Sequence, residues 1–502
     1  MLEGLLRLVD RSLVVAAGGE PARFRMLETL RAYGAERLAE AGETEPTAAR
    51  HTAWFVELAE EAAAHRTARR WMRRLEADYD NLRAVMDRAM AGGDHQTALR
   101  LAGALGWYWQ EHHTDEGRQR LAGALALAEG RPPSIHLART LLSVALVDLM
   151  VFSNFPEIAE AARRSVELFE RFGDQAGAAA AKLQLAFAEL QDRGPSGDMA
   201  RLAAEAEAGF AAAGDSWGEA YAALNSLALN RAYLGLPDRA EAIALRALER
   251  FEALDDRWGT ALALFGLANV ARRRGEVDTA VDRYERAIAA AREDGPLWVL
   301  CAALVELGGV VAVGGDERRA VALHAESAAI IRRTGLRRGI AYASNGLGAI
   351  ARAGGDLERA RQLHHEALEI VREVLGWSVP YTLAQLACTE ARLGALDDAE
   401  ANLREASGLV LRAPQPATAA LILVGHALVA LGRGRLERAA LLLAAADDTR
   451  ERAGVVPLGA ERVEADLVRR AVEDRLAPAA LRSAQAAGRD LSPEDALRLA
   501  LG

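Results

Sequence analysis

The sequence contains a single lysine, Lys182, so almost all of its 61 basic residues are arginine. A phosphate-binding loop of the Gly-x-x-x-x-Gly-Lys-Ser/Thr type needs a lysine directly after its second glycine. Lys182 stands instead in the segment AAAKLQL, and it has no serine in the place that a Ser-x-x-Lys pair requires. These two lysine-dependent chemistries, nucleotide hydrolysis and lactam-type acylation, are therefore excluded.

Cysteines and long apolar runs are also scarce. The two cysteines, Cys301 and Cys388, cannot form a disulfide framework, and their apolar helical surroundings predict inert buried thiols. No stretch approaches 18 uncharged apolar residues, and the N-terminus has no basic region followed by an apolar core. This argues against a membrane span and a signal peptide. We expect a soluble cytoplasmic protein.

The charge pattern lacks a basic surface. The net charge is −10, and arginine is interspersed with acidic residues along the chain. Proteins that owe their affinity to phosphate neutralisation are usually basic or carry a basic face. We therefore do not expect direct nucleic-acid binding.

No set of residues has the spacing of a catalytic or metal site. The histidine pairs at 112–113 and 364–365 do not belong to a His-Glu-x-x-His or comparable zinc motif. The Gly-x-Gly sequences near Asn345 and Gly432 lack both the third glycine and the preceding strand of a dinucleotide loop. We expect no catalytic residue, no cofactor and no metal.

One helical phrase recurs along the sequence. From Gly354 it reads GGDLERARQLHHEAL, and a looser copy, RGEVDTAVDRYERAI, begins at Arg274. An alanine close behind the turn recurs every 40 residues, with one step of 39, at Ala200, Ala240, Ala280, Ala320, Ala360, Ala399 and Ala439. Small residues seven positions after this alanine and twelve positions before it recur with the same period. A repeat of this length predicts stacked units, each too small to bury its own apolar face.

Each unit has two stretches of helix length around a turn such as Gly355-Asp356. Glycine can take the left-handed conformation that ends one helix, and the acidic residue suits the positive end of the next. The small residues at fixed places let two helix backbones approach closely. The sequence therefore predicts an all-α solenoid of helical hairpins with a period of about 40.

The spacing resembles the tetratricopeptide repeat, which places a Leu-Gly pair, a turn glycine and then Ala, an aromatic residue and Ala on the second helix. The matching residues are Leu347, Gly348, Gly355, Ala360, His364 and Ala367 in one unit, and Leu267, Ala268, Gly275, Ala280, Tyr284 and Ala287 in another. The period exceeds the family's usual length of about 34 residues. It is similar to the long-helix repeats in the sensor region of MalT-type bacterial regulators, and this resemblance implies a right-handed superhelix.

The sequence before the repeats resembles the segments that follow the nucleotide-binding module of STAND-class ATPase regulators of the LuxR and AfsR/SARP type. The matching phrases are LVDRSL at Leu8, FRMLET at Phe24 and DNLR at Asp80, and the C-terminal SPEDALRLAL is similar to the end of the same arrays. The first two phrases predict a helix end, a strand, a turn at Gly18-Gly19, a second strand and a helix. We expect a partial winged-helix segment at 1–45, helical linker hairpins at 46–135, the repeat array at 136–450 and C-terminal capping helices at 451–502.

The resemblance implies a non-enzymatic scaffold that binds a partner or effector, the sensor half of a STAND-type signalling or transcriptional regulator. The family's phosphate loop cannot exist in this sequence with Lys182 as the sole lysine, and we expect no helix-turn-helix output module after residue 502. We expect a protein or peptide partner, with the missing ATPase module as one candidate, and leave a small-molecule effector open. The alternative is a DNA-associated regulator that acts through the winged-helix segment.

Two groups of aromatic and histidine residues have competing interpretations. Tyr284, His324 and His364 occupy one repeat position, where packing against the next hairpin is favoured over a polar cavity. The triplet at 107–109 (Trp-Tyr-Trp), together with Trp71, is either an exposed clamp for a partner or a core between two domains. We favour the core.

The binding surface is expected on the concave face, which the first helix of each hairpin lines in tetratricopeptide arrays. Transferred by register, that face includes Asn225, Asn269, Arg272, Tyr342, Asn345, Arg352 and Tyr381. Asparagine and arginine each offer paired hydrogen bonds, which suits a peptide backbone or an anionic molecule. We expect a partner segment more than a metabolite, because a long open groove buries a small molecule poorly. That these residues merely keep the surface soluble is the alternative left open.

Overall fold

The computed structural model describes residues 2–18, 23–65, 69–151, 154–193, 197–231, 237–334, 337–374, 378–412, 414–453, 456 and 459–502. Within these ranges the chain is helical apart from two short strands and the turns between elements. The all-α fold class is therefore confirmed. In the same ranges no helix is both long and apolar enough to cross a lipid bilayer.

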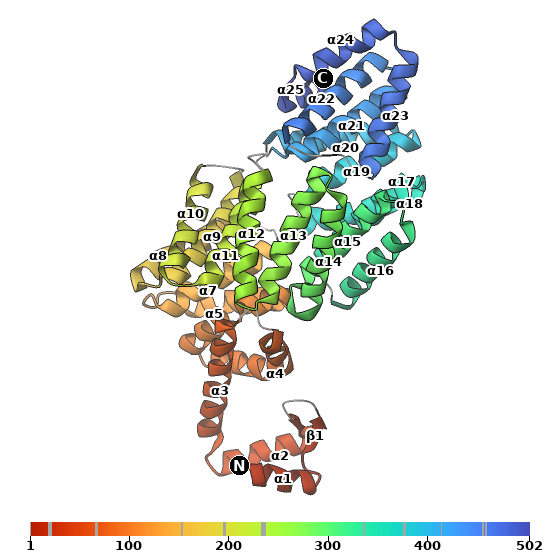
Figure 1. The fold of residues 1–502 in the computed structure, drawn as a ribbon. Coiled ribbons are helices and arrows are strands. Elements are labelled where there is room, and N and C mark those ends of the chain that lie inside the picture. The colour runs from red at the N-terminus through yellow and green to blue at the C-terminus, as the bar shows by residue number, and fades with distance from the viewer. Residues whose placement is uncertain are drawn as a thin grey trace.

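The N-terminal segment forms a small unit at the foot of Figure 1. Helix α1 (Leu2–Asp10) is followed by β1 (Val15–Gly18), β2 (Arg23–Arg25) and α2 (Glu28–Glu40). The strands are antiparallel, with Val15 opposite Arg25 and Ala16 opposite Phe24. The predicted order of helix, strand, strand and helix is confirmed, while Gly19 of the predicted turn lies outside the described residues. Its identity as part of a winged helix stays a prediction.

A helical region joins this unit to the repeats. It comprises α3 (Thr44–Ala64), α4 (Arg69–Ala91), α5 (His95–Glu111) and α6 (Thr114–Leu127). Their shared core contains Leu82, Tyr108 and Trp109, all nearly inaccessible. The indole nitrogen of Trp109 donates a hydrogen bond of 2.9 Å to the hydroxyl of Tyr79. Buried aromatic residues with satisfied polar atoms hold these helices together.

Helical hairpins follow one another from α7 to α22. Their first helices are α7 (Ile135–Val151), α9 (Gln175–Arg193), α11 (Ser216–Arg231), α13 (Arg257–Arg274), α15 (Leu297–Val313), α17 (Arg337–Ala353), α19 (Val379–Leu393) and α21 (Pro416–Gly432). Their second helices are α8 (Phe155–Phe172), α10 (Gly197–Ala212), α12 (Pro237–Ala253), α14 (Val277–Asp294), α16 (Glu317–Thr334), α18 (Leu357–Val374), α20 (Leu396–Arg412) and α22 (Leu436–Ala453). Successive first helices begin about 40 residues apart, so the predicted period is confirmed.

The alanine columns mark the closest contacts of these hairpins. Ala280, Ala320 and Ala360 are completely buried where the two helices of a hairpin meet. The turn glycines Gly315 and Gly355 have φ angles of 89° and 88°, the left-handed conformation expected at the end of the first helix. A side chain larger than alanine at the column positions would push the helices apart.

Neighbouring hairpins also meet through a recurring contact between a phenylalanine and a glycine. A Cβ atom added at Gly259 of α13 would lie 2.1 Å from the ring of Phe251 on α12. The pairs Phe169–Gly177 and Phe210–Gly218 repeat this relation in the two preceding hairpins. Glycine is required there because the ring lies flat against the backbone of the next helix.

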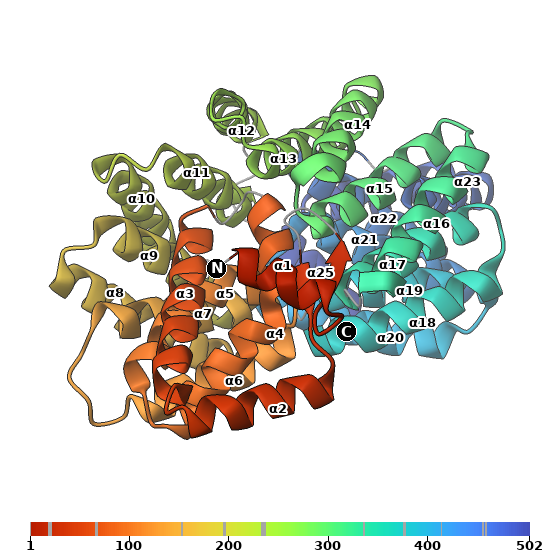
Figure 2. The same ribbon diagram turned by 90° about the horizontal axis from the view of Figure 1, so that it is seen from below.

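First helices pack on the next first helix throughout the array, and second helices lie outside them. Figure 2 shows this arrangement, with α11, α13, α15 and α17 inside and α10, α12, α14 and α16 on the periphery. We call the surface formed by α5 and the first helices of the hairpins the inner face. It is the surface that all units build together.

Three helices follow the last hairpin: α23 (Ala460–Arg475), α24 (Pro478–Arg489) and α25 (Pro493–Leu501). Helix α24 packs on α22, and α25 packs on α20, α21 and α22, so these two cover the end of the array. Helix α23 differs, because it contacts α17 and α21 as well as α22. It therefore lies against two first helices as well as against the last second helix.

Candidate binding site on the inner face

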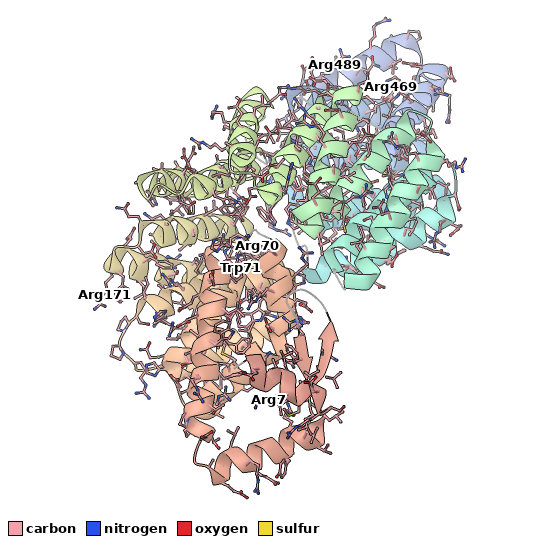
Figure 3. All side chains as sticks on the ribbon, turned by 60° about the horizontal axis from the view of Figure 1, so that its bottom comes forward. Arg7, Arg70, Trp71, Arg171, Arg469 and Arg489 are labelled. Atoms are coloured by element: carbon pink, nitrogen blue, oxygen red, sulfur yellow. The ribbon has the colours of Figure 1, made fainter. Side chains whose placement is uncertain are left out.

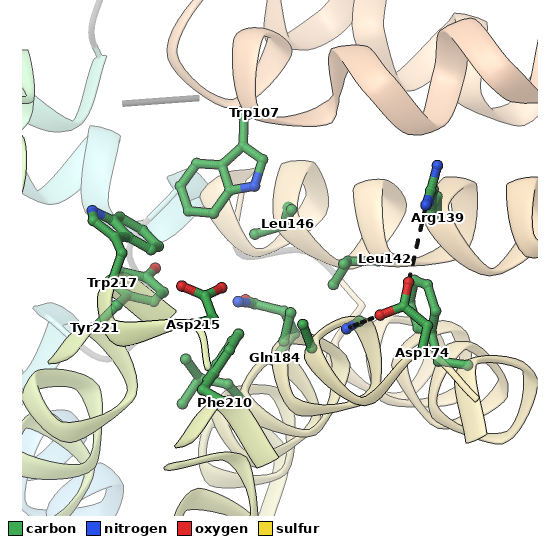
Figure 4. Close-up of a pocket in the computed structure, with 15 residues that line it drawn as sticks. Trp107, Arg139, Leu142, Leu146, Asp174, Gln184, Phe210, Asp215, Trp217 and Tyr221 are labelled. Atoms are coloured by element: carbon green, nitrogen blue, oxygen red, sulfur yellow. Dashed lines mark hydrogen bonds and ion pairs between the residues drawn. The ribbon is translucent and has the colours of Figure 1, made fainter. Parts of the chain in front are cut away.

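A pocket of about 200 Å³ opens on the inner face between α5, α7, α9 and α11. Its apolar wall is formed by Trp107, Leu142, Leu146, Phe169, Ala176, Ala180, Leu183, Phe210, Trp217 and Tyr221. Arg139, Asp174, Gln184 and Asp215 supply its polar groups. Figure 4 shows Trp107 beside Trp217 and Tyr221.

An aromatic cluster forms one wall of the pocket. The ring of Trp107 on α5 lies 6.0 Å from that of Trp217 on α11, with an interplanar angle of 82°. It meets Tyr221 at 6.0 Å and Trp258 of α13 at 6.2 Å, both edge-on. Trp217 and Tyr221 stack on each other at 5.0 Å. Edge-to-face and offset arrangements are the favourable ones for aromatic pairs, so the wall is preorganised.

The polar groups of the pocket lie mainly at helix starts. The carboxylate of Asp174 accepts a hydrogen bond of 2.8 Å from the backbone NH of Gly177, and Asp215 does the same for Gly218. Asp174 also lies 4.0 Å from the guanidinium of Arg139, an exposed residue at the rim. Gln184 is 6% exposed, and Figure 4 shows its amide end pointing toward Asp215. Its amide can both donate and accept a hydrogen bond, as a peptide group requires.

The size and lining of the pocket limit what it can hold. An apolar cavity of about 150 Å³ accommodates benzene, whereas sites for drug-sized ligands and cofactors are roughly 300–1,000 Å³. This pocket therefore fits one aromatic or branched aliphatic side chain. The described residues contain no cluster of three or more His, Cys, Asp or Glu side chains that could hold a metal ion.

The predicted asparagines Asn269 and Asn345 are 7% exposed and serve the fold. Asn269 donates to the carbonyl oxygen of Phe265 at 3.0 Å and accepts from the hydroxyl of Tyr284 at 2.9 Å. The side-chain amide of Asn345 donates a hydrogen bond of 2.8 Å to the hydroxyl of Thr382 on α19. Its side-chain oxygen lies 3.3 Å from a ring nitrogen of His364 on α18. These side chains join helices to one another, which corrects the expectation that they stand open on the concave surface.

Arg352 is fully buried, so it is not available to a ligand in this structure, which corrects its assignment to an open surface. Its Nε atom lies 2.9 Å from the carboxylate of Glu464 on α23, and it donates hydrogen bonds to the backbone and side-chain oxygens of Gln385. The buried charge needs these partners, and one of them comes from outside the repeats.

Arg272, Tyr342 and Tyr381 are partly exposed. Arg272 on α13 lies 3.2 Å from Glu306, whose charge raises the pKa of the arginine. The hydroxyl of Tyr381 accepts a hydrogen bond of 2.6 Å from the side-chain amide of Gln385. The pKa of this hydroxyl is raised, first by burial and then by the carboxylates of Glu461 and Glu306. The structure therefore brings Arg272 and Tyr381 close to α23, with Arg352 beyond Gln385.

Tyr342 packs against the C-terminal apolar core. Of the predicted binding residues, Asn225 on α11 lies nearest the aromatic pocket. Its side-chain amide donates a hydrogen bond of 2.8 Å to the backbone carbonyl oxygen of Tyr221, which lines that pocket. The role of the partly exposed predicted residues in binding stays a prediction.

The competing interpretations of the aromatic groups are resolved by burial. Tyr284, His324 and His364 are fully buried between hairpins, so the packing interpretation is confirmed. In the triplet at 107–109, Tyr108 and Trp109 belong to the core as expected, but Trp107 faces the pocket.

A sequence signal for this pocket was missed. Trp217, Trp258 and Trp298 recur one unit apart near the start of successive first helices. The first two belong to the aromatic cluster, and Trp298 continues the series by meeting Phe265 edge-on at 6.1 Å. A column of large aromatics at an inner-face position would have indicated the wall before any contact was known.

Basic residues are dispersed over the molecule. In Figure 3, Arg7, Arg171 and Arg489 lie on three separate parts of the chain, in α1, α8 and α24. Many other arginines form ion pairs with neighbouring carboxylates, for example Arg100 with Glu60 at 2.6 Å. Among the residues that the structure describes, these arginines lie apart from one another or are paired with carboxylates, which differs from the continuous basic stripe of a nucleic-acid surface.

Comparison with known proteins gives short or distant matches. HTH-type transcriptional regulators of Mycobacterium bovis and Mycobacterium tuberculosis are 37% identical over 117 residues, which is 22% of this chain and 13% of theirs. The matched stretch thus spans a small part of these relatives.

Among solved structures, aspartyl phosphate phosphatase F of Bacillus subtilis covers 74% of this chain and 97% of its own at 12% identity and a TM-score of 0.45. A STAND protein with a tetratricopeptide repeat sensor from Pyrococcus horikoshii covers 72% of this chain and 55% of its own at 14% identity and a TM-score of 0.39. These are similarities of helical architecture. The tetratricopeptide repeat model matches residues 219–293, from α11 to α14, so that part of the chain is similar in sequence to tetratricopeptide repeats.

Proposed function

We propose that the chain is a non-enzymatic scaffold that binds an extended or helical segment of a protein partner along its inner face. The observation that carries the proposal is the aromatic pocket, which the first helices α7, α9 and α11 build together with Trp107 of α5. A single apolar side chain of the partner fills the pocket, and the amide of Gln184 pairs with the partner's backbone.

A protein segment suits this site better than a metabolite. The pocket holds one side chain, and the aromatic series continues beyond it through Trp258 to Trp298. A peptide can use the pocket for one anchor and the neighbouring rings for adjacent residues, whereas a small molecule would be left half exposed. Aromatic anchors in desolvated pockets dominate the energetics of many protein interfaces.

We further propose that the scaffold is the sensor part of a cytoplasmic STAND-type regulator of transcription or signalling. The support is the resemblance of its N-terminal phrases to that class and the short match to HTH-type transcriptional regulators. In this setting the partner segment belongs to the regulator's own nucleotide-binding module or to a separate signalling protein.

A random peptide library displayed on phage tests the proposal without knowledge of the partner. Peptides are selected on the immobilised full chain and counter-selected on the Ala180→Phe variant, whose new ring occupies the pocket. The proposal predicts a family of peptides that share one aromatic or branched aliphatic position and fail to bind the filled variant. Selected peptides that bind both chains equally, or that share no apolar position, would contradict it.

A further inference from the structure

Helix α23 is attached to the array through a buried charge. The carboxylate of Glu464 lies 2.9 Å from Nε of Arg352 on α17 and 3.6 Å from a guanidinium nitrogen of Arg392 on α19. Arg352 and Glu464 are both 0% exposed. The guanidinium of Arg392 also donates a hydrogen bond of 2.7 Å to the backbone carbonyl oxygen of Arg352. Two first helices thus form a site for one carboxylate, and α23 supplies it.

The same segment reaches farther back along the array. The backbone NH of Val456 donates a hydrogen bond of 3.0 Å to the backbone carbonyl oxygen of Arg273 at the end of α13. Glu461, at the start of α23, is near enough to Tyr381 for its charge to raise the pKa of that hydroxyl. Val456 and α23 therefore touch α13, α17 and α19, three first helices of the inner face.

Helix α23 is less deeply buried than α21, the first helix of the last hairpin. Helix α23 buries five residues, Ala460, Glu464, Ala465, Val468 and Val472, and one of the five is the glutamate. Val463 and Leu467 on the same helix are 39% and 40% exposed. Helix α21, by comparison, buries every residue from Thr418 to Ala430. An ion pair in a dry site contributes little net stability, because the loss of hydration offsets its attraction.

The pKa of Glu464 reflects the free-energy cost of burying its charge. Burial raises the pKa of Glu464 above its ordinary value in spite of the two arginines beside it. Within the described residues, its Oε1 atom makes both ion pairs, and neither carboxylate oxygen accepts a well-aligned hydrogen bond. The site therefore holds its carboxylate through charge rather than through directed hydrogen bonds.

The cap of the array does not depend on α23. The guanidinium of Arg438 on α22 donates a hydrogen bond of 2.8 Å to the backbone carbonyl oxygen of Leu499 in α25. Arg452, also on α22, donates a hydrogen bond of 3.2 Å to the backbone carbonyl oxygen of Arg489 in α24. Helices α24 and α25 are held by the last hairpins, and α23 has few contacts with α24. Release of α23 would leave the end of the array covered.

We propose that α23, with Val456, is an internal ligand of the array: it occupies a carboxylate-binding site formed by Arg352, Gln385 and Arg392, and an acidic helix of a partner displaces it. Tyr381, on α19 with two residues of this site, and Arg272, on α13, are already partly exposed. The proposal rests on the proposed function in one respect, that the inner face is the binding face. It concerns hairpins other than those of the aromatic pocket.

Hydrogen exchange of the full chain, followed by mass spectrometry, tests the release of α23. The Glu464→Gln variant leaves two buried arginines without a counter-charge, so the amides of 460–475 should exchange at least tenfold faster while those of α21 and α24 stay unchanged. Glu473→Gln, an exposed position on the same helix, is the control and should match the native chain. Equal exchange in all three chains would overturn the proposal. If the Glu464→Gln chain does not fold, Val468→Asn provides the released state.

A labelled peptide of residues 459–475 tests the site itself. The released chain should bind it saturably, the native chain should bind it at least tenfold more weakly, and a peptide with Gln in place of Glu464 should lose at least tenfold in affinity. Absence of binding to the released chain, or indifference to the glutamate, would overturn the proposal. Neither readout involves the aromatic pocket, so this proposal can fail while the proposed function stands, and the reverse.

Discussion

The Nε atom of Arg352 on α17 lies 2.9 Å from the carboxylate of Glu464 on α23, and neither side chain has any solvent exposure. This pair places the most polar of the predicted binding residues inside the protein. A substitution of Arg352 therefore tests the fold before it tests any ligand.

Removal of Arg352 is expected to be costly. Arg352→Ala leaves the carboxylate of Glu464 with Arg392 alone and should lower the free energy of unfolding by about 3–5 kcal/mol. Arg372→Ala breaks an ion pair with Glu405 in which both side chains are about half exposed, and should cost less than about 1 kcal/mol. Urea denaturation of the native chain and both variants measures the difference. Equal midpoints for the two variants would show that the buried pair is not a distinct element of stability.

Enlargement of the alanine columns is the next test of the fold. Ala280→Leu or Ala320→Leu forces additional methylene groups between fully packed helices and should destabilise the protein by about 1–3 kcal/mol. Ala289→Leu, at an exposed position of α14, is the matched control and should change the melting temperature little. A melting temperature unaffected by either core substitution would refute the assignment of these columns to the helix contact.

Stability should decrease in mild acid because of three buried histidines. Burial lowers the pKa of His324 and His426 to about 4 and that of His364 well below its ordinary value. At His324 and His426 the unfolded chain takes up protons near pH 6.5, whereas the folded chain does so only near pH 4, so the folded state loses stability as the pH falls between these values. Protonation of His364 acts in the same direction. Each histidine contributes a slope of at most about 1.4 kcal/mol per pH unit.

The variant His324→Phe isolates one of these contributions. Both ring nitrogens of His324 lack a hydrogen-bond partner among the described residues, so an apolar ring can replace it. Unfolding free energies at pH 7 and pH 5 should differ less in the variant than in the native chain. An unchanged difference would show that His324 is already protonated, or already exposed, at pH 5.

The two thiols should be unreactive in the folded protein. Cys301 and Cys388 are buried, and the loss of hydration raises the pKa of the first to about 11 and of the second to about 12. Because the thiolate is the reactive form, a disulfide reagent at pH 8 should modify neither cysteine in the native chain and both in urea. Rapid modification of either thiol in the native chain would place it at the surface.

Periodicity and local chemistry were enough to predict the hairpins. Alanine columns such as Ala280 and Ala320 report contacts within one unit, and glycines such as Gly355 report turns, so both are visible in a repeat. The partner of Arg352 was not predictable, because Glu464 stands outside the repeats and meets the arginine only through the curvature of the array. The pocket was missed for the same reason, since Trp107 contacts Trp258 across the inner face.

The central claim is that a partner side chain enters the pocket beneath Trp107. Its most direct measurement is the calorimetric Kd of one selected peptide for the native chain and for the variants Trp107→Ala, Ala180→Phe and Trp54→Ala. Burial of one apolar side chain is worth about 1.5–3 kcal/mol, so the first two variants should bind about 10–100 times more weakly. Trp54 is 58% exposed on α3, away from the inner face, and its removal should leave the Kd unchanged. Equal Kd values for all four chains would contradict the account.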